Sequence, residues 1–342
     1  MRERMVTMKK NMMLQRLAAA LLTGVMAVSV MGMNVFAAEE GAAVTSVEFS
    51  KTVEAEENTL MPNTAFTFSV VPGAAATEDG KVIYAGIAGG AYFAAGAETV
   101  TFAPEDAVNE KSTQISLDDT KFTTPGIYRY VVTETAGAYD GITYDTKSYN
   151  LDVYVVNGTD GLMIQGATLN AQGAIDKTPG FTNIYATNDL TVKKVITGNQ
   201  ADMTKEFAFT ITINGADGEQ YKVKNSDGTF TTITSGTPVT IELGNNEEVK
   251  IYGLSANDTY TVVEEDCSDD GYTTTIEGAD TKDGLTAAGK VDTGDDAVTY
   301  TNTKEVTTPT GIMMDMAPYM LMVLAAAVMA VVFLRRKNTQ ED

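Results

Sequence analysis

The sequence predicts an all-β chain made of two tandem antiparallel β-sandwich domains, preceded by a leader and followed by an apolar helix. Eight segments alternate apolar and polar residues with the two-residue period of a half-buried strand. Gly, Pro, Asn and Asp separate these segments, and no long segment between them has a helical period. The chain has 342 residues, 44% of them hydrophobic, which is enough for about two domains with separate cores.

A cleavable signal peptide is predicted at residues 1–37. The basic stretch MRERMVTMKK precedes a short apolar run, and NVFAAEE then offers small residues at the spacing that signal peptidases accept. A retained membrane helix is the alternative, but the apolar run is short and ends in this cleavage pattern. We therefore expect cleavage after Ala37 and export of the remainder.

The first domain is expected to span residues 44–187 and the second residues 188–304, with the boundary near Ala186 to Asp189. Each domain contains four of the alternating segments. In the first domain these segments are residues 47–53, 65–71, 126–135 and 149–156. In the second domain they are residues 190–196, 206–213, 247–254 and 258–265.

The two halves repeat each other in outline. Each begins with a strand that carries Lys, continues to an FxF strand and a Tyr-rich strand ending in Glu, and closes with an aromatic-Thr-Asn triplet. The polar members in the first half are Lys51, Glu134 and Asn183. Those in the second half are Lys193 or Lys194, Glu264 or Glu265, and Asn302.

Strand alternation selects among these candidates. Lys51 shares a face with two apolar residues of its strand, and Glu134 shares a face with three. The same rule selects Lys194 and Glu264 over their neighbours and puts Asn302 on an apolar face. A charge at the end of an apolar face costs free energy unless it is neutralised or reacts. The alternative is that each residue ends a strand and reaches solvent, but the order Lys, Glu, Asn occurs twice.

The composition excludes several classes of function. The chain has 24 Lys and Arg against 46 Asp and Glu, a formal net charge of -22, and no His. Such a surface repels nucleic acid, and the commonest general base and zinc ligand is missing. Acidic clusters at residues 54–58 and 292–296 lack the spacing of a calcium loop, so we interpret them as solvated turns, with a calcium site as the alternative. The sequence thus indicates no enzyme, no metal site and no cofactor.

Cys267 is the single cysteine, so no intramolecular disulfide can form. Exported folds commonly use disulfides for stability, and another covalent link could take their place here. Since no His is present to activate it, Cys267 is interpreted as an incidental thiol and not as a nucleophile.

The C-terminal residues 305–342 combine three features. TTPTGI at residues 307–312 precedes a nearly unbroken apolar run at residues 316–334, which is about the length needed to span a bilayer. The run is closed by Arg335, Arg336 and Lys337. Positive charge after such a helix keeps the C-terminus cytoplasmic and everything before it outside.

This combination resembles the cell-wall sorting signal of Gram-positive surface proteins, usually written LPxTG. The resemblance implies that a sortase recognises Pro309, Thr310 and Gly311, cleaves after Thr310 and transfers its acyl group to an amine. Because TTPTG lacks the usual Leu, it favours a dedicated, pilus-type sortase over a housekeeping one. An ordinary single-pass membrane protein is the alternative.

The motifs FSK, VVTE and FTN in the first half, and VKK, VVEE and YTN in the second, resemble those of the two-domain major pilins of Gram-positive bacteria. In that family a streptococcal-type pilin isopeptide-linkage domain precedes a domain similar to collagen-adhesin B-type repeats, and both are Ig-like sandwiches. The resemblance implies two self-formed isopeptide bonds, each beside an acidic residue. These bonds would join Lys51 to Asn183 beside Glu134, and Lys194 to Asn302 beside Glu264.

Such bonds are chemically reasonable in a buried site. Desolvation favours the neutral, nucleophilic amine of Lys, and it raises the pKa of Glu, which can donate a proton toward the Asn carbonyl oxygen and help ammonia leave. Each site reacts once, so this is autocatalysis without turnover. A bond across the first domain would close a loop of about 130 residues, which suggests roughly 5 kcal/mol of stabilisation.

The resemblance implies a structural shaft subunit of a covalent surface pilus, attached to the cell wall. Its partners would be a pilus-type sortase, other copies of itself, minor pilins and peptidoglycan, with no nucleic acid and with membrane only through the C-terminal helix. Polymerisation needs an acceptor amine, for which Lys177 in AIDKTPGFTN is our choice and Lys147 the rival. A non-polymerising anchored adhesin or stalk protein is the alternative function.

Overall fold

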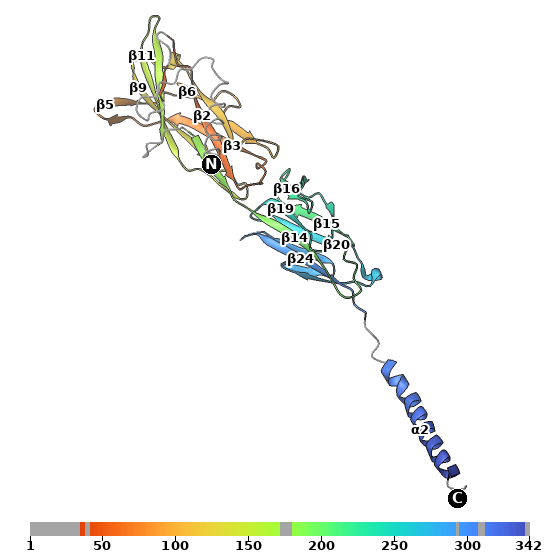
Figure 1. Cartoon of the computed structure of the whole chain (residues 1–342). Coiled ribbons are helices and arrows are strands. Elements are labelled where there is room, and N and C mark those ends of the chain that lie inside the picture. The colour runs from red at the N-terminus through yellow and green to blue at the C-terminus, as the bar shows by residue number, and fades with distance from the viewer. Residues whose placement is uncertain (1–34, 38–41, 172–179, 292–293, 307–311, 339–342) are drawn as a thin grey trace, which may run out of the picture.

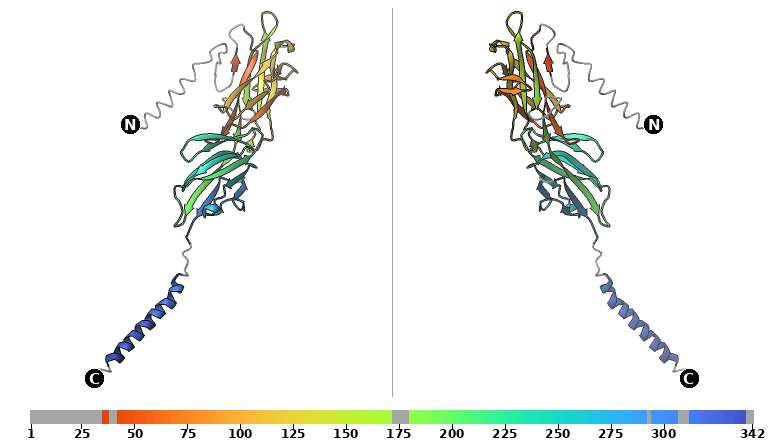
Figure 2. Two further views of the ribbon diagram at one scale, coloured as in Figure 1. Left: turned by 90° about the vertical axis from the view of Figure 1, so that its right-hand side faces the viewer. Right: turned by 90° about the vertical axis from the view of Figure 1, so that its left-hand side faces the viewer.

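The computed structural model describes residues 35–37, 42–171, 180–291, 294–306 and 312–338 (Figure 1). Within these ranges the chain is all β apart from α2 (Ile312–Asn338) and two short 3-10 helices, which confirms the predicted fold class. Two sandwiches lie end to end, and α2 extends beyond the second (Figures 1 and 2). The predicted leader lies outside the described residues except for β1 (Val35–Ala37). Among the described residues, no helix is both long and apolar enough to cross a membrane.

The first sandwich consists of two sheets. One has the strand order β1-β12-β11-β9-β3-β7, with β4 paired to β5 and β5 to β9, and the other has the order β10-β13-β2-β8-β6. The 3-10 helix η2 (Asp119–Lys121) follows β8. The strand bounds are β2 (Ser46–Ala55), β3 (Thr64–Pro72), β4 (Ala76–Glu78), β5 (Lys81–Ala85), β6 (Ala91–Tyr92), β7 (Thr99–Phe102), β8 (Glu110–Leu117), β9 (Gly126–Thr135), β10 (Ile142–Thr143), β11 (Ser148–Asn157), β12 (Leu162–Ala171) and β13 (Gly180–Tyr185).

The second sandwich also consists of two sheets. Their strand orders are β17-β16-β19-β14-β24-β21 and β18-β15-β20-β23-β22. The 3-10 helix η3 (Ser268–Asp270) follows β20. The strand bounds are β14 (Thr187–Thr197), β15 (Phe207–Asn214), β16 (Gln220–Lys224), β17 (Phe230–Thr234), β18 (Val239–Leu243), β19 (Glu248–Ser255), β20 (Thr259–Glu264), β21 (Thr273–Glu277), β22 (Thr281–Asp283), β23 (Thr286–Lys290) and β24 (Asp296–Thr303).

Each sandwich has its own hydrophobic core between its sheets. Along β2, burial alternates so that Val47, Phe49 and Val53 are buried together with Lys51. The same alternation along β14 buries Lys194 with its apolar neighbours. Full burial of a large apolar side chain stabilises a fold by about 1.5–3 kcal/mol. The period-two pattern therefore fixes which residues face the core, and it carries one lysine into each core.

The first and last strands of each sandwich lie side by side and run in parallel. β2 pairs with β13, and β14 pairs with β24. β5 and β9 form a third parallel pair. The sequence predicted antiparallel sheets, and these three parallel pairs correct that prediction. Alternation along a strand is the same in both kinds of pairing, so it could not distinguish them. A sandwich that the chain enters at one end and leaves at the other must have first and last strands that run in the same direction.

The junction between the sandwiches is short. Ala186 is the single residue between β13 and β14. Side chains also bridge the two sandwiches: the hydroxyls of Thr59 and Thr187 lie 3.0 Å apart, and the Tyr185 hydroxyl donates to Glu219 Oε1 at 2.6 Å. The two sandwiches are thus held together by buried polar contacts as well as by the chain itself.

Candidate functional site

The first sandwich brings Lys51, Glu134 and Asn183 together. They come from β2, β9 and β13, so both sheets contribute. Lys51 Nζ donates to Glu134 Oε2 at 2.9 Å, and Asn183 Nδ2 donates to Glu134 Oε1 at 2.6 Å. The side chains of Lys51 and Glu134 are fully buried, and Asn183 is 0% exposed. The alternative that these residues end strands and reach solvent is wrong.

The second sandwich repeats this arrangement with Lys194 of β14, Glu264 of β20 and Asn302 of β24. Lys194 Nζ donates to Glu264 Oε1 at 2.5 Å, and Asn302 Nδ2 donates to the same oxygen at 2.9 Å. All three residues are buried, whereas the neighbouring Lys193 is half-buried and Glu265 is exposed. Each carboxyl therefore contacts both the amine and the amide of its site.

Strand register explains how the same triplet arises twice. In the parallel pair β2–β13, Lys51 lies opposite Phe181, and Asn183 follows two residues later on the same face. In the pair β14–β24, Lys194 lies opposite Tyr300, and Asn302 follows two residues later. In each aromatic-Thr-Asn triplet the aromatic residue lies opposite the Lys. The Asn is the next residue of that strand whose side chain faces the core.

The environment of both lysines opposes a positive charge. Burial lowers the pKa of Lys51 and of Lys194, although the adjacent carboxyls partly offset this effect. Burial also raises the pKa of Glu134. Aromatic rings contribute to the burial: Lys51 Nζ lies 4.4 Å from the centre of the Phe66 ring, and Lys194 Nζ lies 4.1 Å from that of Phe207. In the first sandwich, desolvation therefore favours a neutral amine beside a neutral carboxyl.

Each Asn carbonyl oxygen has its own donor. The backbone N–H of Asp145 donates to Asn183 Oδ1 at 2.7 Å, and Thr274 Oγ1 donates to Asn302 Oδ1 at 2.9 Å. The expectation that the Glu faces this oxygen is wrong, because Glu134 and Glu264 contact the amide nitrogens instead. A carboxyl beside both nitrogens is placed to take a proton from the amine and give it to the leaving ammonia.

Three contributors were missed by sequence reasoning. The Asp145 carboxylate accepts from the Thr182 N–H at 2.9 Å, which holds its loop against β13. Thr274 also lies 3.0 Å from Glu264 Oε2. Cys267 is buried and its Sγ lies 3.1 Å from Asn302 Nδ2, while burial raises the pKa of the thiol. Cys267 is therefore a neutral packing neighbour of the site, and no motif in the sequence marks any of these contacts.

The arrangement suits acyl transfer between side chains. A neutral lysine amine can attack the Asn side-chain carbonyl, whose developing negative charge meets a fixed donor. The new C–N bond replaces the bond to the amide nitrogen, which leaves as ammonia. Because both reactants are held within one core, the reaction needs no bound partner.

The remaining predicted residues lie elsewhere. Lys147 is exposed, and its amine lies 3.8 Å from the Asp145 carboxylate. Lys177 and the motif Pro309, Thr310 and Gly311 lie outside the described residues. Among the residues that are described, no group of three or more Cys, Asp or Glu side chains is suited to hold a metal ion.

Family comparisons agree with this architecture. The family described as "Spy0128-like isopeptide containing domain" matches residues 47–186, and a family described only as a domain of unknown function matches residues 188–304. A protein named "Pilin" from Streptococcus pyogenes serotype M1 is 30% identical over 302 residues, covering 82% of this chain and 87% of that protein. The pilus tip adhesin Cpa of Streptococcus pyogenes is 29% identical over 172 residues, which cover 48% of this chain and 25% of the adhesin.

Comparison with solved structures also finds major pilins among the similar proteins. The major pilin protein T3.2 from Streptococcus pyogenes matches with a TM-score of 0.58 and 30% identity, covering 77% of this chain and 99% of that one. Another major pilin from Streptococcus pyogenes matches with a TM-score of 0.58 and 26% identity over the same shares. Two sandwiches in tandem, a buried Lys–Glu–Asn triplet in each, and similarity over most of the chain lead to one conclusion. The chain belongs to the family of major pilins with a Spy0128-like isopeptide domain, and it is a pilus shaft subunit.

Proposed function

We propose that this chain is the shaft subunit of a sortase-assembled covalent pilus, with one isopeptide bond in each sandwich and attachment to the cell wall. The observation that carries the proposal is the buried Lys–Glu–Asn triplet, which occurs in both cores with the same register. The bonds assigned are Lys51 to Asn183 and Lys194 to Asn302. Each joins the first strand of its sandwich to the last, where the two strands are already neighbours.

Mass spectrometry of the intact ectodomain, residues 38–310, tests the internal bonds. Each bond releases one ammonia, so the mass should be lower by about 17 Da per bond. Glu134→Ala should abolish the loss in the first sandwich and Glu264→Ala the loss in the second. Glu265→Ala is the matched control, because Glu265 is exposed and should leave both losses intact. A well-folded protein of unmodified mass would rule out the assignment.

Assembly requires a donor and an acceptor. We propose that a pilus-type sortase cleaves after Thr310 and joins its acyl group to Lys177 of the next subunit, with Lys147 as the rival acceptor. On cells with the matching sortase, the chain should form a ladder that survives boiling in detergent, since amide bonds link the subunits. Lys177→Arg retains the charge but removes the primary amine, so it should reduce the ladder to monomer. A persistent ladder would exclude Lys177, and a wild type without any ladder would favour the anchored adhesin.

A further inference from the structure

Part of β12 becomes an open sheet edge once the leader is removed, although Ile164 stays covered because its carbonyl accepts from the Val44 N–H at 2.9 Å. β12 lies between β11 and β1, and β1 consists of Val35–Ala37, the last residues of the predicted leader. β1 covers Gly166 to Thr168 of β12 in antiparallel register. Cleavage after Ala37 would therefore uncover the backbone of these residues.

β12 lacks most of the features that protect a sheet edge, although its pairing with β11 has a bulge at Gln165. Natural edges are short or carry charges, Pro or bulges that turn them away from other chains. β12 has ten residues, LMIQGATLNA, with neither a charge nor Pro. The opposite edge of the same sheet, β7, has only four. In a chain with a net charge of -22, an uncharged edge of this length is a place where another copy can approach without strong repulsion.

We propose that, after leader removal, the uncovered edge of β12 takes residues Thr307–Thr310 of a second copy as an added parallel strand. This inference deepens the proposed polymerisation and rests on it. The last described anchor of the tail is the Val306 N–H, which donates to Asn199 Oδ1 of its own sandwich at 3.1 Å. The four residues that follow, extended, span roughly 13 Å, about the length of the uncovered segment. Backbone pairing of this kind is a common way to bind an extended peptide.

The direction of the added strand follows from the shape of the subunit. The turn between β11 and β12 lies at the end of the molecule farthest from α2, and from there β12 runs toward the second sandwich (Figure 1). β24 leads out of the second sandwich at the opposite end (Figure 1). In a head-to-tail rod, the tail of the next copy arrives at the β11–β12 turn and runs in the same direction as β12. Thr310 then comes last, toward Ala171.

Two features of the edge suit this tail. With β1 in place opposite it, Thr168 Oγ1 has no hydrogen-bond partner among the described residues. Thr307 and Thr308 in the tail can satisfy such a hydroxyl, because Thr–Thr pairs bond across neighbouring strands. Pro309 is tolerated, because an added edge strand needs pairing on one side only.

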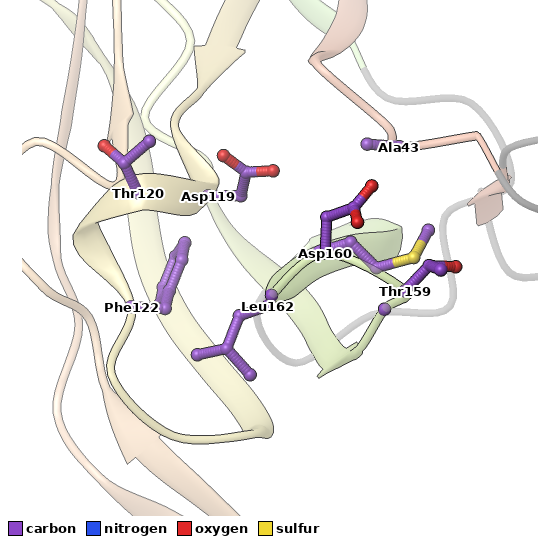
Figure 3. A pocket seen from close by; sticks show the side chains of 10 residues that line it. Ala43, Asp119, Thr120, Phe122, Thr159, Asp160 and Leu162 are labelled. Atoms are coloured by element: carbon purple, nitrogen blue, oxygen red, sulfur yellow. The ribbon is translucent and has the colours of Figure 1, made fainter.

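The charges beside the start of β12 are also complementary to those of the tail. A hollow of about 540 Å³ lies beside the start of β12, and Asp119 and Asp160 face it from two sides (Figure 3). Lys304 lies two residues before the last described anchor of the tail, and its amine lies 5.4 Å from the centre of the Tyr272 ring. Lys304 would then be the basic residue of the tail that comes nearest to this hollow, where Lys121 of the receiving copy lies 3.5 Å from the Asp118 carboxylate.

Amide hydrogen exchange on polymer and monomer tests the added strand. Both are prepared as the processed chain, the monomer from cells without sortase. The segment 162–171 should exchange about tenfold or more slowly in the polymer, because the tail is tethered beside it. The segment 99–102 of β7 serves as the internal control and should not change. Equal exchange of 162–171 in monomer and in an intact polymer would overturn the proposal, whereas absence of polymer would count against the proposed function instead.

Variants of Thr308 distinguish strand pairing of the tail with β12 from the covalent link between subunits. Thr308→Pro removes one backbone N–H, while Thr308→Ala retains it, and neither touches a folded sandwich. Thr308→Pro should lose the protection of 162–171 in any polymer formed, and Thr308→Ala should keep it.

A peptide probe tests the edge without sortase. The peptide of residues 304–310 should shift the NMR signals of β12 in an ectodomain that starts at Ala38. It should bind at least tenfold more weakly to one that starts at Val35 and keeps β1. Equal binding to both proteins, or no shift at millimolar peptide, would contradict the proposal.

Discussion

The proposed isopeptide reaction depends on where one proton lies between a buried amine and a buried carboxyl. In water the two groups would form an ion pair, but desolvation penalises both charges. In the first sandwich this effect lowers the pKa of Lys51 and raises that of Glu134. The proton therefore shifts toward the carboxyl, and the amine that remains is the nucleophile. Formation of the proposed amide bond would remove the ionisable amine from the core, and with it the cost of burying a charge there.

Thr274 should accelerate the reaction in the second sandwich only. Its hydroxyl donates to Asn302 Oδ1, where negative charge develops during attack by the amine. Thr274→Val keeps the shape but removes this donor, so we expect bond formation to slow by about 10²-fold or more. Thr274→Ser restores the hydroxyl and should react at nearly the normal rate.

This rate can be measured by taking samples of newly synthesised ectodomain over time and determining their intact mass. The first sandwich of the same molecule is the internal control, since its Asn183 accepts from a backbone N–H instead. Equal rates in wild type and Thr274→Val would show that the hydroxyl has no role in the reaction.

The buried Lys–Glu–Asn triplets were predictable because they follow strand alternation. Lys194 and Lys193 are neighbours, and parity alone identified the one that faces the core. Thr274 and Asp145 could not be found in this way, because their positions depend on how β21 and a loop pack against the last strand of each sandwich. Sequence therefore indicated the Lys, Glu and Asn of each triplet, but not the donors that contact the Asn oxygen.

Between the two sandwiches, β13, β16 and the turn before β20 bring buried oxygens together. Tyr221 OH lies 3.1 Å from Glu219 Oε2 and 3.1 Å from Asp258 Oδ2, and Tyr185 OH donates to Glu219 Oε1. We call these four residues the interdomain cluster. One Tyr221 proton cannot serve both carboxyls, so a second proton on the cluster relieves the repulsion between them.

The interdomain cluster predicts a stability that depends on pH. Burial, with the nearby charge of Glu219, raises the pKa of Asp258 to about 7. Tyr139, Tyr185 and Tyr221 face the same site and supply no positive charge. Since the folded state holds a proton that the unfolded state releases near pH 4, stability should fall as pH rises from about 4 to about 7, by up to roughly 1.4 kcal/mol per pH unit.

Thermal unfolding of the ectodomain at a series of pH values tests this expectation. Asp258→Asn cannot ionise and should flatten the dependence between about pH 4 and pH 7. Asp227→Asn is the matched control, because Asp227 lies on an exposed turn of the same sandwich and should preserve the slope. A wild-type profile as flat as that of Asp258→Asn would show that the cluster does not titrate in this range.

Eight of the described strands were predictable as elements, but their pairing and most of the other strands were not. Alternation located the strands that carry Lys51 and Glu134, because it reports burial of one face. It could not show that β2 runs parallel to β13, since parallel and antiparallel strands alternate alike. The interdomain cluster was also not predictable, because the stretch GADGE before β16 has the composition of an ordinary turn.

At the scale of the whole molecule, the positions of the links determine which bonds carry tension. If the chain is pulled from Lys177 of one subunit to Thr310 of the same subunit, tension passes through Asn183 and along β14. At Lys194 it crosses the second bond to Asn302 and leaves through the tail. The first bond, between Lys51 and Asn183, lies outside this path. It would protect the fold of the first sandwich, whereas the second bond would carry the load.

Pulling single polymers should therefore separate the two bonds. Loss of the second bond in Glu264→Ala frees about 110 residues between Lys194 and Asn302, which extends each subunit by up to roughly 370 Å. Loss of the first bond in Glu134→Ala should add no extension, because the 177–194 segment, about 17 residues or roughly 60 Å, lies in the path with or without that bond. If Lys147 were the acceptor, about 47 residues would be free and the extension would approach roughly 160 Å, with or without the first bond. Equal long extensions in both variants would mean that tension enters through the N-terminus, and the proposed linkage through Lys177 would be wrong.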